Sequence, residues 1–140
     1  MLDALLAYDW TDEEILRHGF LPTMRDYEVI VRHYTAGAAE TRRVVLCGCA
    51  EVAYRLALPH GAFSMDDRLL SSDTTDAAEG FVWAVASASI EVVRAVVDSP
   101  RAADWHARLG MAMYELCVAT NVYTLTAVCH AVTVAKHTAK

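Results

Sequence analysis

The chain has 140 residues, of which 55% are hydrophobic and 21% are charged, and its formal net charge is −6. This length is usual for one domain, and the hydrophobic content excludes an intrinsically disordered chain, so we predict a single domain over residues 1–140. The basic residues are scattered, which argues against nucleic-acid binding because no basic stripe exists to follow a phosphate backbone.

The first ten residues carry no lysine or arginine, whereas Asp3 and Asp9 are acidic. A secretory signal begins with basic residues, so we expect a cytoplasmic protein. In that compartment the four cysteines are expected to be reduced thiols. Lysine occurs only twice while arginine and alanine are plentiful, a bias that indicates a GC-rich bacterial genome.

An acidic residue precedes an arginine by four positions at four places in the chain. This spacing puts both charges on one surface of a helix, with the acid on the favoured N-terminal side. The sequence therefore predicts an all-α fold, a bundle of four or five helices. The four pairs are Glu13 and Arg17, Glu28 and Arg32, Glu51 and Arg55, and Asp104 and Arg108.

Capping residues and stop signals give the expected helix boundaries. Ser99 and Pro100, for example, supply an N-cap and a first helical residue. Gly110 is expected to bend or break the helix that follows. The predicted helices cover residues 11–18, 23–36, 38–58, 76–97 and 100–135, with single turns in residues 1–7 and after Ser64.

The predicted helix over residues 38–58 has two complementary stripes. Its inner stripe of Val45, Cys49, Val52 and Leu56 is expected to be buried. A β-rich domain is the alternative, because residues 44–56 also alternate in polarity and residues 111–134 are rich in Val, Thr and Tyr. Glycine at position 48 favours that alternative modestly. We prefer the helical interpretation because the charged residues keep a four-residue spacing.

Residues 116–135 contain no charged side chain over about the length of one membrane span. A membrane helix is nevertheless unlikely from this sequence, because Asn121, His130 and four threonines interrupt the segment and no basic cluster flanks it. We expect instead a helix at the centre of the bundle or at the interface of a homo-oligomer.

The polar residues of this last predicted helix are the candidates for a ligand site. Tyr123, Thr126 and His130 share one helical face and could line a small-molecule pocket, with His130 as a general acid or base. Asn121 lies on a neighbouring face, and Trp83 could form a pocket wall. The alternative is that neighbouring helices satisfy these polar groups by hydrogen bonds.

We predict no metal and no cofactor. Cys47 and Cys49 lie two positions apart and do not face each other on a helix, and no recognised zinc, di-iron, nucleotide or nucleophile motif occurs. The predicted function is small-molecule binding, with a reaction at His130 as its sharpest form. The alternative is a non-enzymatic interaction protein that acts through an apolar helix face or its acidic surface.

Overall fold

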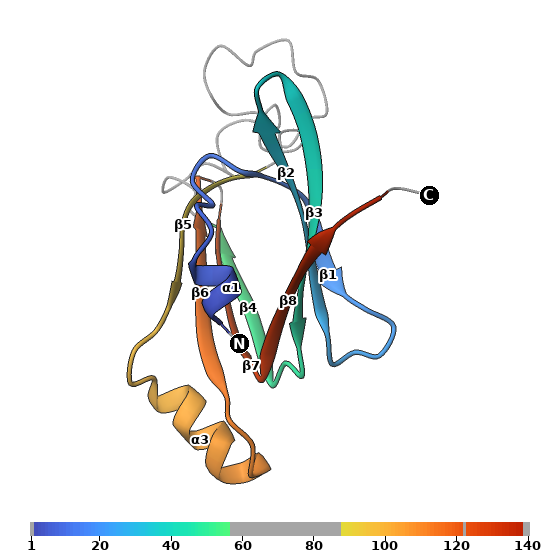
Figure 1. The fold of residues 1–140 in the computed structure, drawn as a ribbon. Helices are drawn as coiled ribbons and strands as arrows, with labels where there is room; N and C mark the ends of the chain where they lie inside the picture. Colours follow the sequence, from blue (N-terminus) through green and yellow to red (C-terminus); the bar gives the residue numbers. More distant parts are fainter. Residues whose placement is uncertain (1, 57–87, 122, 139–140) are drawn as a thin grey trace, which may run out of the picture.

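The prediction of an all-α helical bundle is wrong. The structure, a computed structural model, describes residues 2–56, 88–121 and 123–138, and in these residues eight strands form an antiparallel sheet in the order β4-β7-β6-β5-β1-β2-β3-β8 (Figure 1). The elements are α1 (Asp3–Leu6), β1 (Glu14–Phe20), β2 (Tyr27–Thr35), β3 (Ala38–Cys47), β4 (Glu51–Leu56), β5 (Ala88–Ala95), α3 (Pro100–Leu109), β6 (Tyr114–Thr120), β7 (Tyr123–Cys129) and β8 (Ala131–Lys136).

The hairpin of β2 and β3 shows why the chain is β here. Ala36 and Gly37 have φ angles of 46° and 83°, and a two-residue turn of this kind matches the twist of an antiparallel pair. Val44 and Leu46 are buried, whereas Val45 between them is only half-buried. This alternation is the signature of a strand with one face in the core. The predicted helices over 23–36 and 38–58, and the inner stripe that began at Val45, are therefore wrong.

The charge spacing misled the prediction because four is also an even number. Residues four apart lie on the same face of a strand as well as on one surface of a helix, so the spacing does not separate the two. In the structure Glu28 pairs across the sheet with Arg43 and with Arg17, the latter at 3.5 Å. Only Asp104 and Arg108, 3.1 Å apart on α3, form the predicted pair within a helix, among the residues that the structure describes.

The remaining predicted helices are mostly strands in the described residues. Of the segment 11–18, residues 14–18 belong to β1, and of the segment 100–135 only α3 is helical before β6, β7 and β8 begin. Two local predictions are confirmed: Ser99 caps α3 ahead of Pro100, and Gly110, with a φ of 69°, ends it. The turn expected near the N-terminus is α1. Of the segment 76–97, residues 88–95 are β5, whereas residues 76–87 and the turn predicted after Ser64 lie outside the described residues.

The long apolar segment thus consists of strands rather than one helix. In the described part of the chain, no helix combines the length and the hydropathy needed to cross a membrane.

The sheet is divided where β5 meets β1. These two strands share only two residue pairs, Glu14 with Ser89 and Ile15 with Ala88, so the sheet has one half of β1, β2, β3 and β8 and another of β5, β6, β7 and β4. One hydrophobic cluster takes side chains from both halves and from the N-terminal segment that includes α1. Its buried members are Leu5, Trp10, Ile15, Tyr27, Val29, Val31, Val44, Leu46, Ile90, Leu116, Tyr123, Leu125, Ala127, Cys129 and Val132.

Within the described residues, the chain crosses between the two halves twice, at adjacent points. Residues 48–50 lead from β3 to β4, and His130 alone joins β7 to β8. The His130 N–H donates to the Cys47 carbonyl at 3.0 Å, which ties the two crossings together. Gly48 has a φ of 62°, and a Cβ there would lie 3.3 Å from that of His130. A glycine therefore fits this corner both in conformation and in space.

Helix α3 packs on the outer face of the second half. Its buried Ala102 and half-buried Trp105 contact Met113 and Val128, which lie just before β6 and on β7. The helix covers only one end of this outer face. The remaining part of the face, over β4 and β7, is where the candidate site lies.

Candidate functional site

The structure does not bring the predicted site residues together. Tyr123 and Thr126 are three residues apart on β7, so they lie on opposite faces of the strand. Tyr123 is buried in the core, whereas Thr126 lies on the outer face. The pocket between helices that the predicted function required is wrong because the fold has no helical bundle.

The other predicted residues lie elsewhere. His130 sits in the corner after β7, where its Nδ1 donates to the Ala112 carbonyl at 2.7 Å. The Oδ1 of Asn121 accepts a hydrogen bond from the backbone N–H of Ser89 at 2.9 Å, in the turn before β7. Trp83 lies outside the described residues. Both described contacts hold backbone segments together, and a ligand role for these residues stays a prediction.

The outer face of the second half carries small side chains between arginines. Residues that pair directly across an antiparallel sheet share a face. One row of paired residues consists of Ala53, Thr126, Cys117 and Arg94, and the next consists of Arg55, Thr124, Ala119 and Val92. Arg94 and Arg55 thus end their rows on opposite outer strands, β5 and β4. Three strand spacings across the sheet and the two-residue offset between the rows put their backbones roughly 16 Å apart.

A groove of about 470 Å³ lies at the β4 side of this face. Its polar lining consists of guanidinium groups and hydroxyls, which donate hydrogen bonds. Such a set suits a ligand that carries acceptor oxygens, above all carboxylates. The lining residues are Ala53, Tyr54, Arg55, Arg101, Thr124 and Thr126, which come from β4, α3 and β7.

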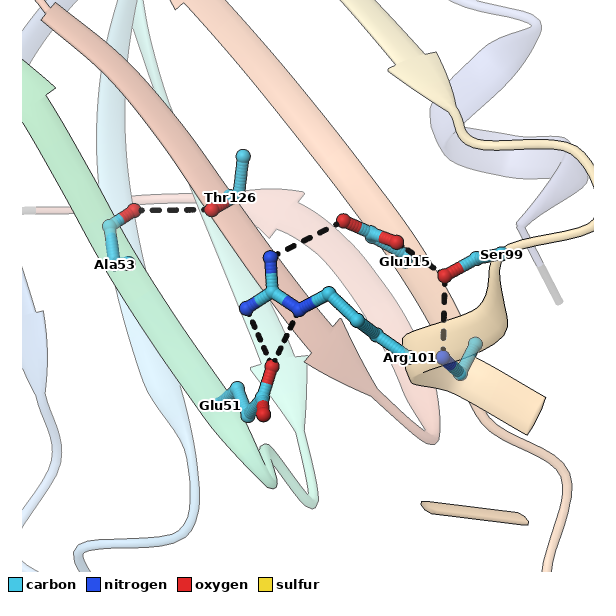
Figure 2. A network of polar contacts seen from close by, with 7 residues as sticks. Glu51, Ala53, Ser99, Arg101, Glu115 and Thr126 are labelled. Atoms are coloured by element: carbon cyan, nitrogen blue, oxygen red, sulfur yellow. Dashed lines mark hydrogen bonds and ion pairs between the residues drawn. The ribbon is translucent and has the colours of Figure 1, made fainter. Parts of the chain in front are cut away.

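Arg101 connects α3 to the sheet at the end of the groove. Its Nε donates to Oε2 of Glu51 on β4 at 2.8 Å, and its Nη2 contacts the same oxygen (Figure 2). Its Nη1 lies 3.4 Å from Oε1 of Glu115 on β6. A hydrogen bond from the side chain of Trp105, and then Arg101, hold the pKa of Glu51 below its usual value. The guanidinium is thus shared by two carboxylates.

Glu115 also anchors the start of α3. Its Oε2 accepts a hydrogen bond from the Ser99 hydroxyl, and the same hydroxyl oxygen accepts from the backbone N–H of Ala102 at 3.1 Å. Ser99 is therefore the N-cap that links the helix to β6, and it is buried. This chain of contacts, drawn in Figure 2, fixes the position from which Arg101 reaches the groove.

A second polar cluster lies at the other end of the core. The Glu13 carboxylate is 1% exposed, and its Oε1 contacts Nδ1 of His33 and accepts a hydrogen bond from the Tyr8 hydroxyl at 3.2 Å. Its Oε2 has no hydrogen-bond partner among the described residues. Burial, and next the Glu13 charge, raise the pKa of Tyr8. This cluster ties the segment that follows α1 to β2.

A third cluster consists of aromatic rings around His18. Its ring centroid lies 5.1 Å from that of Tyr123 and 5.8 Å from those of Tyr27 and Tyr54. Rings at these separations pack against one another and leave no space between them for a ligand. Burial lowers the pKa of His18 and raises the pKa of Tyr123 to about 12. The cluster therefore joins the two halves of the sheet by packing.

Sequence reasoning missed the three arginines of the groove region. Arg55 was assigned to a helical pair with Glu51, whereas Glu51 contacts Arg101, which lies 50 residues further along the chain. Arg94 and Arg101 attracted no attention because neither belongs to a local motif. Only the cross-strand register, which is a long-range property, places these side chains around one surface.

The comparisons with known proteins identify a family. Residues 2–140, nearly the whole chain, match the family described as YxiG-like protein. The comparison with curated proteins finds no match.

Proposed function

The chain belongs to the YxiG-like protein family, and from this premise we propose that it is a binding protein whose groove between β4, β7 and α3 receives an acidic segment of a partner protein. The observation that carries the proposal is the placement of Arg55 and Arg101 along the groove, with Arg94 at the far side of the same outer sheet face. Thr126 keeps its expected role as a ligand-binding residue, now together with Thr124, Arg55 and Arg101 rather than with His130.

The charges of this face support an acidic partner. The whole chain has a net charge of −6, yet neither Arg55 nor Arg94 forms an ion pair with another residue that the structure describes. Exposed guanidinium groups bind carboxylates through two parallel hydrogen bonds, which fixes the orientation of the ligand as well as adding attraction. Complementary charge of this kind also speeds association and excludes partners of the wrong sign.

The shape of the site supports a protein segment rather than a small molecule. Small-molecule sites usually enclose most of the ligand surface, whereas this groove lies on the outer face of a sheet, beside the exposed Ala53 and Arg55. Arg55 and Arg94, at the two ends of the face, have backbones roughly 16 Å apart, a span that about five residues of extended chain would cover. An extended segment with acidic residues at both ends would therefore contact both.

A cytoplasmic location is part of the proposal. It is supported by the four cysteines, Cys47, Cys49, Cys117 and Cys129, which carry free thiols. Reduced thiols are typical of proteins in the cytosol. A homo-oligomer also stays a prediction. Light scattering on each sample of the peptide-binding experiment would reveal a change of oligomeric state.

The binding test uses a fluorescein-labelled ten-residue peptide rich in Asp and Glu, followed by fluorescence anisotropy. We expect the peptide to bind and the affinity to fall as salt is raised, because exposed charges are screened. The double variant Arg55→Glu with Arg94→Glu should weaken binding at least about tenfold, which corresponds to about 1.4 kcal/mol.

Arg25→Glu is the matched control for each of the single variants Arg55→Glu and Arg94→Glu, because it makes the same charge change at an exposed arginine between β1 and β2. This variant should bind the peptide as the natural protein does. Equal weakening by Arg25→Glu, or equal affinity for a lysine-rich peptide of the same length, would overturn the proposal. If free glutamate bound as tightly as the peptide, the ligand of the groove would be a small molecule rather than a protein segment.

A further inference from the structure

Three N–H groups of Arg101 already face carboxylates. A guanidinium offers five N–H donors in a planar fork, and a carboxylate binds best to two parallel donors on one edge. Glu51 takes the edge formed by Nε and Nη2, and Glu115 faces Nη1 at 3.4 Å. An acidic ligand must therefore displace Glu51 before it can pair with the edge formed by Nε and Nη2.

The two carboxylates differ in how firmly they are held. Glu115 is 11% exposed and is bound to Ser99 at the N-cap, so its displacement would disturb the start of α3. Glu51 is 34% exposed and lies on β4, whose strand neighbour among the described residues is β7 alone. Glu51 is therefore the carboxylate that can exchange.

From these contacts we propose that Glu51 is a built-in competitor, which occupies the ligand-binding edge of Arg101 until an acidic group displaces it. This inference rests on the proposed function and deepens it, because it assigns the residue that sets the affinity of the groove. Arg55 and the threonine hydroxyls would hold the ligand first, and Arg101 would then exchange Glu51 for the ligand carboxylate. The carboxylate of Glu51 and that of the ligand are chemically equivalent. A ligand that offers only a carboxylate therefore does not displace Glu51, and only a segment that makes further contacts pairs with Arg101.

The first test compares peptide binding by the natural protein and by Glu51→Gln. The glutamine keeps the size of the side chain and removes its charge. We expect the acidic peptide to bind roughly two- to fivefold more tightly, the size of one exposed ion pair. In an Arg101→Gln background the same Glu51→Gln change should leave the affinity unaltered. A gain that persists without Arg101 would show that Glu51 acts only as a general negative charge, and it would overturn the inference.

The second test does not depend on the peptide. The Nε–H resonance of Arg101 is followed by NMR while inorganic phosphate is added to the natural protein and to Glu51→Gln. Phosphate should shift this resonance at a lower concentration in the variant, because the edge that binds it is no longer occupied by a carboxylate. Equal titrations of the two proteins would refute the competitor role. If the phosphate result is as expected but no acidic peptide binds, the proposed function fails while the role of Glu51 remains.

Discussion

At the scale of single residues, Glu13 is the costliest side chain to bury. An ionised carboxylate inside a protein must be paired, and removal of one partner of a buried pair leaves the other uncompensated. His33 is that partner, and Tyr8 adds a hydrogen bond. The N-terminal segment that carries Tyr8 also places Leu5 and Trp10 in the core. This polar cluster therefore stabilises the packing of the N-terminal segment against the sheet.

We predict that His33→Ala lowers the free energy of unfolding by about 2–4 kcal/mol, because it leaves the Glu13 charge without its partner. Urea denaturation at pH 7 measures the change. The double variant Glu13→Gln with His33→Ala should recover part of the loss, since no charge is then buried. A loss below about 0.5 kcal/mol for His33→Ala, a value typical of surface sites, would mean that the pair contributes nothing.

At the scale of elements, the start of α3 is held in place by the hydroxyl of Ser99. Ser99 is buried, accepts from the Ala102 N–H and donates to Glu115, so one side chain both caps the helix and fixes it to β6. We predict that Ser99→Ala costs about 1–2 kcal/mol of stability in urea denaturation. Ser99→Thr retains the hydroxyl and should lose much less. Equal losses in the two variants would show that packing rather than the cap is responsible.

The same helix shows what can be read from sequence. Its cap at Ser99, its Pro100 and its end at Gly110 were predicted correctly, because each depends on a few neighbouring residues. The strands were not predicted, because a four-residue charge spacing fits one face of a strand as well as one surface of a helix. Gly37 illustrates the ambiguity: it separates the predicted helices over 23–36 and 38–58, yet with its positive φ it completes a two-residue hairpin turn.

The groove could not be predicted in this way. Arg55 and Thr124 are neighbours only because β4 pairs with β7, and Arg101 reaches Glu51 only because α3 lies across the sheet. Each of these contacts joins residues that are far apart in the sequence. The register that creates them is set by the packing of the whole core, which a local pattern does not contain.

At the scale of the whole molecule, the buried thiols and phenols make stability sensitive to alkali. Burial raises the pKa of Cys49 from 9.0 to about 11, that of Cys129 from 9.0 to about 12, and that of Tyr123 from 10.0 to about 12. For each group the folded state prefers the protonated form. Its contribution is thus fully present below the unfolded pKa and is lost as the pH rises through the folded one.

We therefore predict that the free energy of unfolding is constant near pH 8, falls above pH 9, and falls more steeply above pH 10, where unfolded tyrosine ionises. Urea denaturation at a series of pH values measures this dependence. Tyr123→Phe should reduce the slope above pH 10 and leave the slope between pH 9 and 10 unchanged. Constant stability up to pH 10.5 would contradict the assignment of these groups to the core.

The two chain crossings beside Gly48 also affect when the sheet can be completed during synthesis. Strand β8 follows the other described strands along the chain, yet it covers the edge of β3, and its immediate predecessor β7 belongs to the opposite half. A nascent chain therefore leaves β3 uncovered until residues 131–136 have emerged from the ribosome. An open strand edge is a template for aggregation. The growing chain is thus exposed to misassembly at the β3 edge until β8 has been made and has paired with β3.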